Sequence, residues 1–172
     1  MNDVASSPRI EPARADHLPA VARLADVIWR RCYREILSKE QMDYMLNWMY
    51  APEVLQRELK EGIRFDRLLI EDQFIGFVSY GPHPPPGTFK LHKLYLHPDW
   101  HGRGLGSLLL RHSENSARQL GANRMILNVN KQNRHALRTY ERNGYAIVES
   151  VTVDIGKGFV MDDFIMAKAL NG

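Results

Sequence analysis

The stretch that decides the fold is His97–Ser107, HPDWHGRGLGS, which joins a strand-like run to an amphipathic helix through three closely spaced glycines. Before it, residues 89–97 (FKLHKLYLH) alternate as a strand does. After it, apolar side chains recur at helical spacing over residues 105–120. The glycines let the backbone turn sharply and approach a ligand without side chains in the way. Because they open a helix, whose first N–H groups are unpaired and converge, the stretch predicts an anion-binding site.

Two common phosphate-binding patterns do not fit this loop. A Walker A loop needs a Lys followed by Ser or Thr, and the loop holds no Lys. The dinucleotide pattern G-x-G-x-x-G needs a third glycine where Ser107 or Leu109 stands. The loop alone therefore leaves two interpretations open: it binds another class of anion, or it starts a helix that holds no ligand.

Length, charge and cysteine content bound the kind of protein. The chain has 172 residues, a formal net charge of +3 and one cysteine, Cys32. This length suits one domain with a single core, and a lone cysteine forms neither an intrachain disulfide nor a Cys-rich zinc site. Asp3 and Arg9 interrupt the start of the chain as no signal peptide would, and no apolar run approaches the roughly 20 residues of a bilayer span. We expect one cytoplasmic domain over residues 1–172, with no membrane partner and no metal.

Hydrophobic periodicity predicts an α+β chain with a mainly antiparallel sheet. The expected N-caps are Asp16, Ser38 with Gln41 in a capping box, and Asn133. Helices are expected over 16–32, from Ser38 along the Met42–Met49 stripe, and over 52–62, 105–120 and 133–142; strands are expected within 67–80 (two, with a break at 72–73), 89–97, 124–129, 145–155 and 159–170.

The glycine loop resembles the acetyl-CoA motif of the GNAT N-acetyltransferase superfamily, [QR]-x-x-G-x-[GA], which reads here HGRGLG, with His101 in place of Gln or Arg. A second family element, N-x-x-A-x-x-x-Y, follows at Asn133, Ala136 and Tyr140. The run LHKLYLHP is similar to the diamine and polyamine acetyltransferases, and YREILSKEQMDYML to the PaiA-like branch. The resemblance implies an α/β fold whose mixed, mostly antiparallel sheet of about seven strands is flanked by helices and splayed between strands four and five.

The resemblance also implies a division of the chain and a role for each matching residue. Residues 89–149 would form the acetyl-CoA core, while the helices of 16–62 and the hairpin of 145–170 would shape the acceptor site. Tyr140 would protonate the departing CoA thiolate, a role that suits a phenol within hydrogen-bond reach. The cofactor-binding residues implied are Leu94, Tyr95 and Leu96 by their backbones, His101, Gly102, Arg103, Gly104, Leu105, Gly106 and Ser107 at the pyrophosphate, and Asn128, Asn133, Ala136 and Tyr140 along the rest of coenzyme A.

An amine acceptor arrives protonated, so a side chain or a chain of water molecules must remove a proton. His92 aligns with a glutamate that serves as base in the diamine branch, and an imidazole suits neutral pH; the alternative is a structural strand histidine. Asp162 and Asp163 stand in an otherwise apolar strand, so at least one should face a wet cleft and attract a cation, unless they only protect a sheet edge. Trp29 and Tyr33 could wall the acceptor pocket or simply pack in the core.

The resulting hypothesis is an enzyme that moves an acetyl group from acetyl-CoA to an amine by direct attack in a ternary complex. The acceptor could be a polyamine or another small amine, and an amino acid, an antibiotic amine or a protein terminus stay open. One alternative is a non-catalytic acyl-CoA-binding or regulatory module. A nucleic-acid-binding domain that uses the basic segment 101–142 is disfavoured, since that segment lacks interleaved aromatic residues. We expect no nucleic-acid partner; the protein could act alone or as a homodimer.

Overall fold

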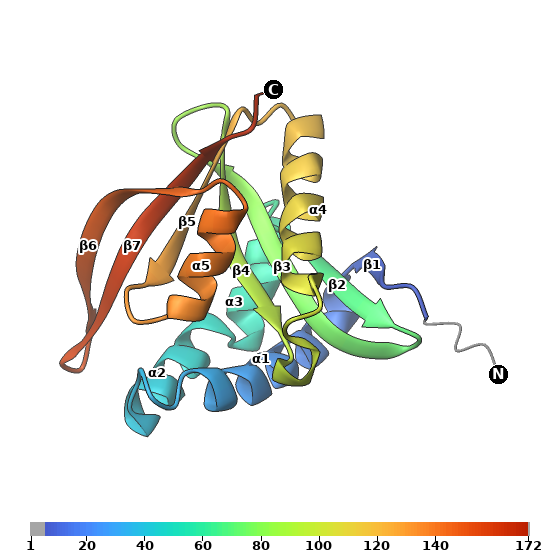
Figure 1. The fold of residues 1–172 in the computed structure, drawn as a ribbon. Helices are drawn as coiled ribbons and strands as arrows, with labels where there is room; N and C mark the ends of the chain where they lie inside the picture. The colour runs from blue at the N-terminus through green and yellow to red at the C-terminus, as the bar shows by residue number, and fades with distance from the viewer. Residues whose placement is uncertain (1–5, 172) are drawn as a thin grey trace.

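A computed structural model describes residues 6–171 as a seven-stranded sheet with helices on both faces (Figure 1). Residues 1–5 and 172, which the expected domain includes, lie outside the described part. The strand order is β1-β2-β3-β4-β5-β7-β6. The strands are β1 (Arg9–Pro12), β2 (Arg64–Ile70), β3 (Gln73–His83), β4 (Thr88–Leu96), β5 (Arg124–Asn130), β6 (Ala146–Gly156) and β7 (Phe159–Ala169); the helices are α1 (Leu18–Cys32), α2 (Lys39–Met49), α3 (Pro52–Lys60), α4 (Leu105–Gln119) and α5 (Arg134–Arg142), with 3-10 turns η1 (Ala15–His17) and η2 (Pro98–Trp100).

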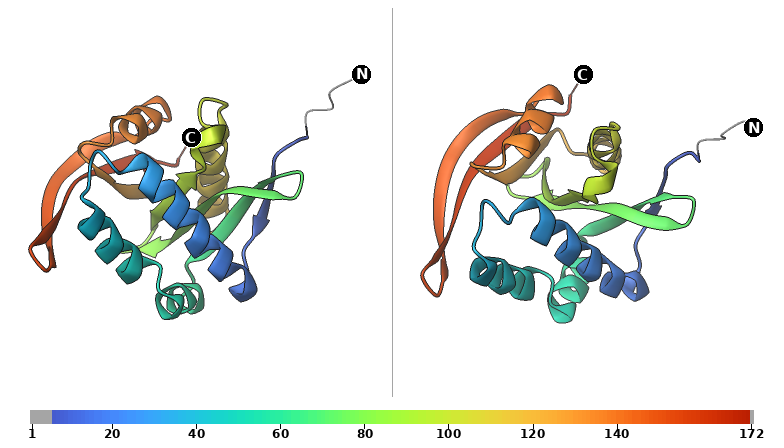
Figure 2. Two further views of the ribbon diagram at one scale, coloured as in Figure 1. Left: turned by 90° about the horizontal axis from the view of Figure 1, so that it is seen from below. Right: turned by 60° about the horizontal axis from the view of Figure 1, so that its bottom comes forward.

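The helices form two layers, one on each face of the sheet. Helices α4 and α5 cover one face, and α1, α2 and α3 cover the other (Figure 2). Each layer has its own apolar cluster: Leu109 and Leu110 of α4 pack against the sheet on the first face, and Ile28 and Trp29 of α1 on the second. None of the helices within residues 6–171 is long and apolar enough to cross a membrane.

The sheet is antiparallel except at its centre, where β4 and β5 run parallel. These two strands pair only from Thr88 opposite Arg124 to Leu91 opposite Leu127, and beyond that point they separate. The backbone of Leu94–Leu96 therefore has a partner in β3 but none in β5. The expected mixed, mostly antiparallel seven-stranded sheet is confirmed, and the split lies between the fourth and fifth strands.

Strand β4 carries a bulge where it separates from β5. Ser79 pairs with Lys93 and Tyr80 with Leu91, so His92 is the extra residue. The bulge interrupts the alternation of side chains, because Leu91 and Leu94 both pack in the cluster under α4 whereas Lys93 reaches α3 on the other face. Regular alternation would place His92, two residues before Leu94, on the same face of β4 as Leu94, and the bulge removes this reason for a shared face.

The N-terminal elements differ from expectation at two points. The edge strand β1 was not expected, since four residues that include Pro12 carry too little periodic signal. Asp16 is not an N-cap: η1 precedes α1, whose N-cap is His17, and the His17 Nδ1 accepts the backbone N–H of Arg14 at 3.0 Å. A 3-10 turn moves the helix start by one short turn, which single-residue capping rules do not detect.

The caps of α2 and α5 follow the sequence. The Ser38 hydroxyl accepts the backbone N–H of Gln41 at 3.1 Å, and the Asn133 side chain accepts that of Ala136 at 3.2 Å. The Gln41 side chain does not complete a capping box; it donates to the Val160 carbonyl at 2.8 Å. This bond ties α2 to β7 and so closes one end of the space between the α1–α3 layer and the sheet.

Candidate active site

The glycine loop shapes an open cradle at the start of α4. Gly102 and Gly104 have φ angles of +77° and +76°, a region that side chains other than glycine rarely adopt. A Cβ placed at Gly102, Gly104 or Gly106 would meet no heavy atom within 4 Å. The glycines are therefore not required by packing inside the protein. They leave room for a ligand beside the unpaired N–H groups of the helix start, which favour an anion.

The side chains of the loop separate into two groups. The His101 ring lies 5.0 Å from the His135 ring in a parallel stack, and its Nε2 lies 2.9 Å from the Leu96 carbonyl, so His101 braces the loop against β4 and α5. Arg103 does not line the cleft: its guanidinium lies over the Trp100 ring at 4.7 Å. At this position the structure places a cation beside the cradle rather than inside it.

One continuous cleft of about 760 Å³ runs from this cradle along the split between β4 and β5 to the α1–α3 layer. It thus joins an anion site, an unpaired strand edge and a partly apolar chamber. Of the residues expected to bind the cofactor, all but Arg103 line it: Leu94, Tyr95, Leu96, His101, Gly102, Gly104, Leu105, Gly106, Ser107, Asn128, Asn133, Ala136 and Tyr140.

Tyr140 is buried where α5 meets the middle of the cleft. Burial, and then the neighbouring Tyr33, raise its pKa above the usual value of 10.0. The phenol therefore keeps its proton at any working pH and can donate it, but it cannot act as a base there.

Trp29 and Tyr33 hold the end of α1 against this region. Their rings lie 4.9 Å apart, and the Asn133 amide donates to the Tyr33 hydroxyl at 3.2 Å. Both side chains line the cleft and also belong to the apolar cluster under the sheet. The structure thus combines the two interpretations that the sequence left open, pocket wall and core.

His92 lines the cleft from the bulge of β4. Burial, and then Lys90 and Lys93, lower the pKa of His92 from 6.5 to about 4. The Nε2 atom is buried, with no hydrogen-bond partner among the residues that the structure describes. The imidazole is therefore neutral at pH 7 and free to accept a hydrogen bond, although a pKa this low makes it a weaker base than a free imidazole.

The low pKa of His92 predicts a pH dependence of stability. The unfolded chain binds a proton near pH 6.5 and the folded one only near pH 4, so the free energy of unfolding falls as the pH drops through this window. Replacing His92 with Gln should make the fall smaller. Chemical denaturation at a series of pH values measures the free energy of unfolding. The same pH dependence in the parent and the His92→Gln variant would contradict the lowered pKa of His92.

The two neighbouring aspartates point to different places. Asp163 is buried and lines the cleft, where burial raises its pKa and the Asn128 side chain partly offsets this. Asp162 does not line the cleft; its carboxylate binds Lys131 at 2.6 Å and Thr152 at 2.9 Å on the outer side of β7. Because successive strand residues face opposite ways, only one of the pair can reach the cleft.

Several cleft residues have no counterpart among those expected from the sequence. Arg57 and Glu58 of α3 and Lys90 and Lys93 of β4 line the chamber, as do the apolar residues Met45 and Met49 of α2. Cys32 also lines it, although it is far from the motif in the sequence, and burial raises the pKa of its thiol. Helical periodicity identified α2 and α3 but could not show which of their side chains the sheet would meet.

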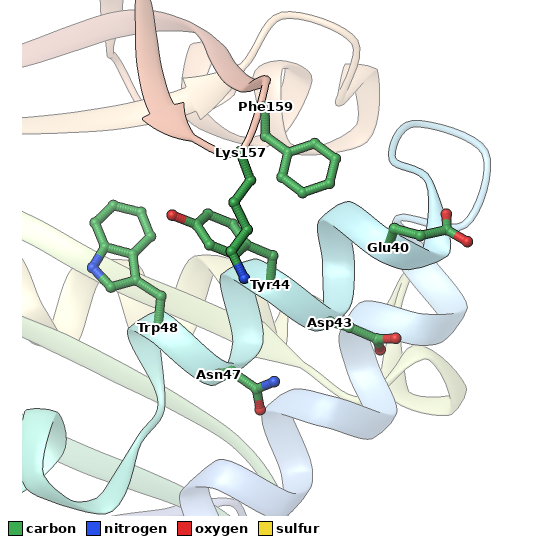
Figure 3. Close-up of a pocket in the computed structure, with 7 residues that line it drawn as sticks. All are labelled: Glu40, Asp43, Tyr44, Asn47, Trp48, Lys157 and Phe159. Carbon is green, nitrogen blue, oxygen red and sulfur yellow. The ribbon is translucent and has the colours of Figure 1, made fainter.

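A second depression lies outside the cleft, between α2 and the turn of the β6–β7 hairpin (Figure 3). Trp48 lines both this depression and the cleft. The Lys157 ammonium lies over the Tyr44 ring at 5.4 Å, and Tyr44 in turn donates to the Ile155 carbonyl. These contacts hold the hairpin tip against α2.

The fold and the cleft together define a protein with an open glycine cradle at a helix start and, in the same cleft, a strand edge without a partner in β5. The family model described as "Acetyltransferase (GNAT) family" matches residues 24–145. The chain belongs to this family. The match covers both the glycine loop and the α5 element with Tyr140.

Comparisons with individual proteins agree with the family. An uncharacterized N-acetyltransferase of Mycobacterium tuberculosis is 35% identical over 81 residues, which make up 47% of this chain and 51% of that one. The aligned part thus spans about half the length of this relative. The spermidine N(1)-acetyltransferase of Thermoplasma acidophilum is 24% identical over 86% of this chain and 91% of that one. The crystal structure of the PaiA N-acetyltransferase from Thermoplasma acidophilum, in complex with coenzyme A, has a TM-score of 0.81 at 24% identity and covers 95% of this chain and 99% of its own.

Proposed function

We propose that this chain is an acetyl-CoA-dependent N-acetyltransferase that acetylates a small amine by direct attack in a ternary complex. The observation that carries the proposal is the single cleft, which joins the glycine cradle, the separated strands β4 and β5 and the buried Tyr140. A polyamine is one candidate acceptor, because the chain is similar to the spermidine N(1)-acetyltransferase of Thermoplasma acidophilum. The acetyl-CoA core is residues 89–149, and helices α1–α3 with the β6–β7 hairpin form the acceptor side.

The residues present fit coenzyme A. The cradle at Gly102, Gly104 and Gly106 has room where a pyrophosphate would approach the N–H groups of α4. The open edge of Leu94–Leu96 offers backbone groups to an extended arm with amide groups, as a strand edge does to an added strand. A basic side chain that lines the cleft, Arg142, suits the remaining phosphate.

Bound acetyl-CoA would supply an acetyl group activated as a thioester, which the acceptor amine attacks. Tyr140 keeps its proton and would donate it to the leaving thiolate. The neutral His92 would accept a proton from the incoming amine, directly or through water, and the buried Asp163 would attract that amine. Cys32 is not needed as a nucleophile, because its raised pKa keeps it a thiol.

Thiol release from acetyl-CoA across a panel of amines tests the proposal, with acetyl-CoA binding measured in parallel by calorimetry. We expect binding and amine-dependent thiol release, both retained when Cys32 is replaced with Ala. Binding without release on any amine would favour the non-catalytic acyl-CoA-binding module. The absence of both would overturn the assignment.

A further inference from the structure

The part of the cleft beside helices α1–α3, called the acceptor chamber below, has an uneven distribution of charge. Its α3–β4 side carries three cations, Arg57, Lys90 and Lys93, and one anion, Glu58. Its β7 side carries Asp163. Only one of the cations is neutralised by a direct contact: the Lys93 ammonium lies 2.9 Å from the Glu58 carboxylate, with both side chains largely buried.

The other two cations have no carboxylate partner. No ion pair within residues 6–171 involves Arg57 or Lys90 at 4 Å or less. Lys90 is partly buried, and desolvation lowers its pKa, an effect that the charge of Asp163 opposes without a direct ion pair. A half-buried cation without a partner is costly, and an anionic ligand group would relieve that cost.

The positive charge on the α3–β4 side of the chamber disfavours the binding of a polyamine. Its far ammonium groups would approach Arg57 and Lys90, and like charges at short range repel. A chain that left the chamber past Trp48 would enter the outer depression, where the Lys157 ammonium lies over Tyr44 (Figure 3). Two carboxylates, Glu40 and Asp43, also line this depression, and Asp43 already binds Arg30 at 2.8 Å and Lys39 at 2.8 Å.

We propose that the acceptor is a small zwitterionic amine, the class that includes amino acids, and that Arg57 and Lys90 bind its carboxylate while its amine faces Asp163 and His92. This inference rests on the proposed function and names the substrate class of the same site. Arg57 and Lys90 are thereby specificity-determining residues. The two ends of such an acceptor match the two charged sides of the chamber, which neither a simple alkylamine nor a polyamine does.

Matched acceptors isolate the carboxylate. Thiol release with saturating acetyl-CoA is measured for a set of amino acids, for the corresponding amino-acid amides, and for n-butylamine, putrescine and spermidine. We expect the best amino acid to exceed its own amide at least about tenfold in kcat/KM and to exceed both polyamines. An amide equal to its acid, or a polyamine as the best acceptor, would overturn this inference while leaving the proposed function intact; no release with any amine would instead count against the function itself.

Charge-removing variants locate the effect. Arg57→Gln should raise the KM for the amino acid about tenfold and leave the kinetics of the amide nearly unchanged, because only the carboxylate loses a partner. Lys90→Gln also removes a charge that lowers the pKa of His92, so its expected effect is an about tenfold loss of the preference for the acid over its amide. Lys90→Gln should also improve putrescine as an acceptor. Lys60→Gln, on the exposed side of α3, removes the same charge outside the cleft and should change nothing. Thermal unfolding confirms that each variant is folded; folded variants whose KM values match the parent would contradict the assignment.

Discussion

Replacing Tyr140 with Phe is expected to lower kcat about 100-fold or more and to leave the affinity for acetyl-CoA within about twofold. The substitution removes a single hydroxyl from a ring that stays buried at the same place in the cleft. Positioned general acids contribute roughly 10²- to 10⁴-fold, so loss of the proton donor should appear in kcat rather than in binding. Steady-state kinetics together with calorimetric titration of acetyl-CoA measure the two effects separately.

The neighbouring Tyr145 provides a matched control. Its ring lies 5.8 Å from that of Tyr140, but its hydroxyl donates to the buried Glu114, which Lys168 also binds. Tyr145→Phe should therefore reduce the free energy of unfolding by about 1–3 kcal/mol and leave kcat unchanged. If Tyr140→Phe behaved in the same way, losing stability but not rate, the role of proton donor would be wrong.

The second large effect is expected at Gly106, where replacement with Asp should weaken acetyl-CoA binding about 100-fold without loss of stability. The position lies in the first turn of α4, and a Cβ there meets no protein atom within 4 Å. A carboxylate in the first turn stabilises a helix by interacting with its N–H groups and dipole. The same carboxylate would compete with a pyrophosphate for those groups and repel it, and 100-fold corresponds to about 2.7 kcal/mol.

Gly106→Ala is the control for the backbone effect of losing glycine. Alanine adds a methyl group without charge and should raise helix stability by about 0.5–1 kcal/mol while acetyl-CoA binding changes little. Calorimetry and thermal unfolding on both variants give the comparison. Unaltered binding in Gly106→Asp would show that the phosphates do not lie at this helix start.

The parts of the fold that the sequence predicted well are those with strong local signals. The run from β4 through the glycine loop into α4 combines strand alternation, glycines and a helical stripe of apolar residues. Each of these signals predicts the local structure of its own segment. The same is true of α5, whose cap at Asn133 and stop at Gly144 lie close together in the sequence. By contrast, β1 exists because β2 offers it an edge, and its four residues alone do not indicate a strand.

The candidate site was harder to predict wherever it depends on which face a side chain takes. The extra residue at His92 changes which side chains of β4 face the cleft. Which of Asp162 and Asp163 faces the cleft depends on the register of β7, which the sequence does not give. Whether Arg57 reaches the cleft depends on how α3 packs over β4, and these two elements are far apart in the sequence. Local patterns thus predict the proposed cofactor loop, whereas the proposed acceptor side depends on tertiary packing.

Because β4 and β5 separate, a ligand bound between them would contribute to the stability of the folded protein. Within residues 6–171, strands of the two blocks of the sheet, β1–β4 and β5–β7, pair with each other only along the short ladder that ends at Leu91 and Leu127. In the proposed enzyme, a cofactor laid between them bridges the gap that the ladder leaves. Because any ligand that binds only the folded state stabilises it by mass action, the resistance of this protein to unfolding follows the concentration of its own reactant.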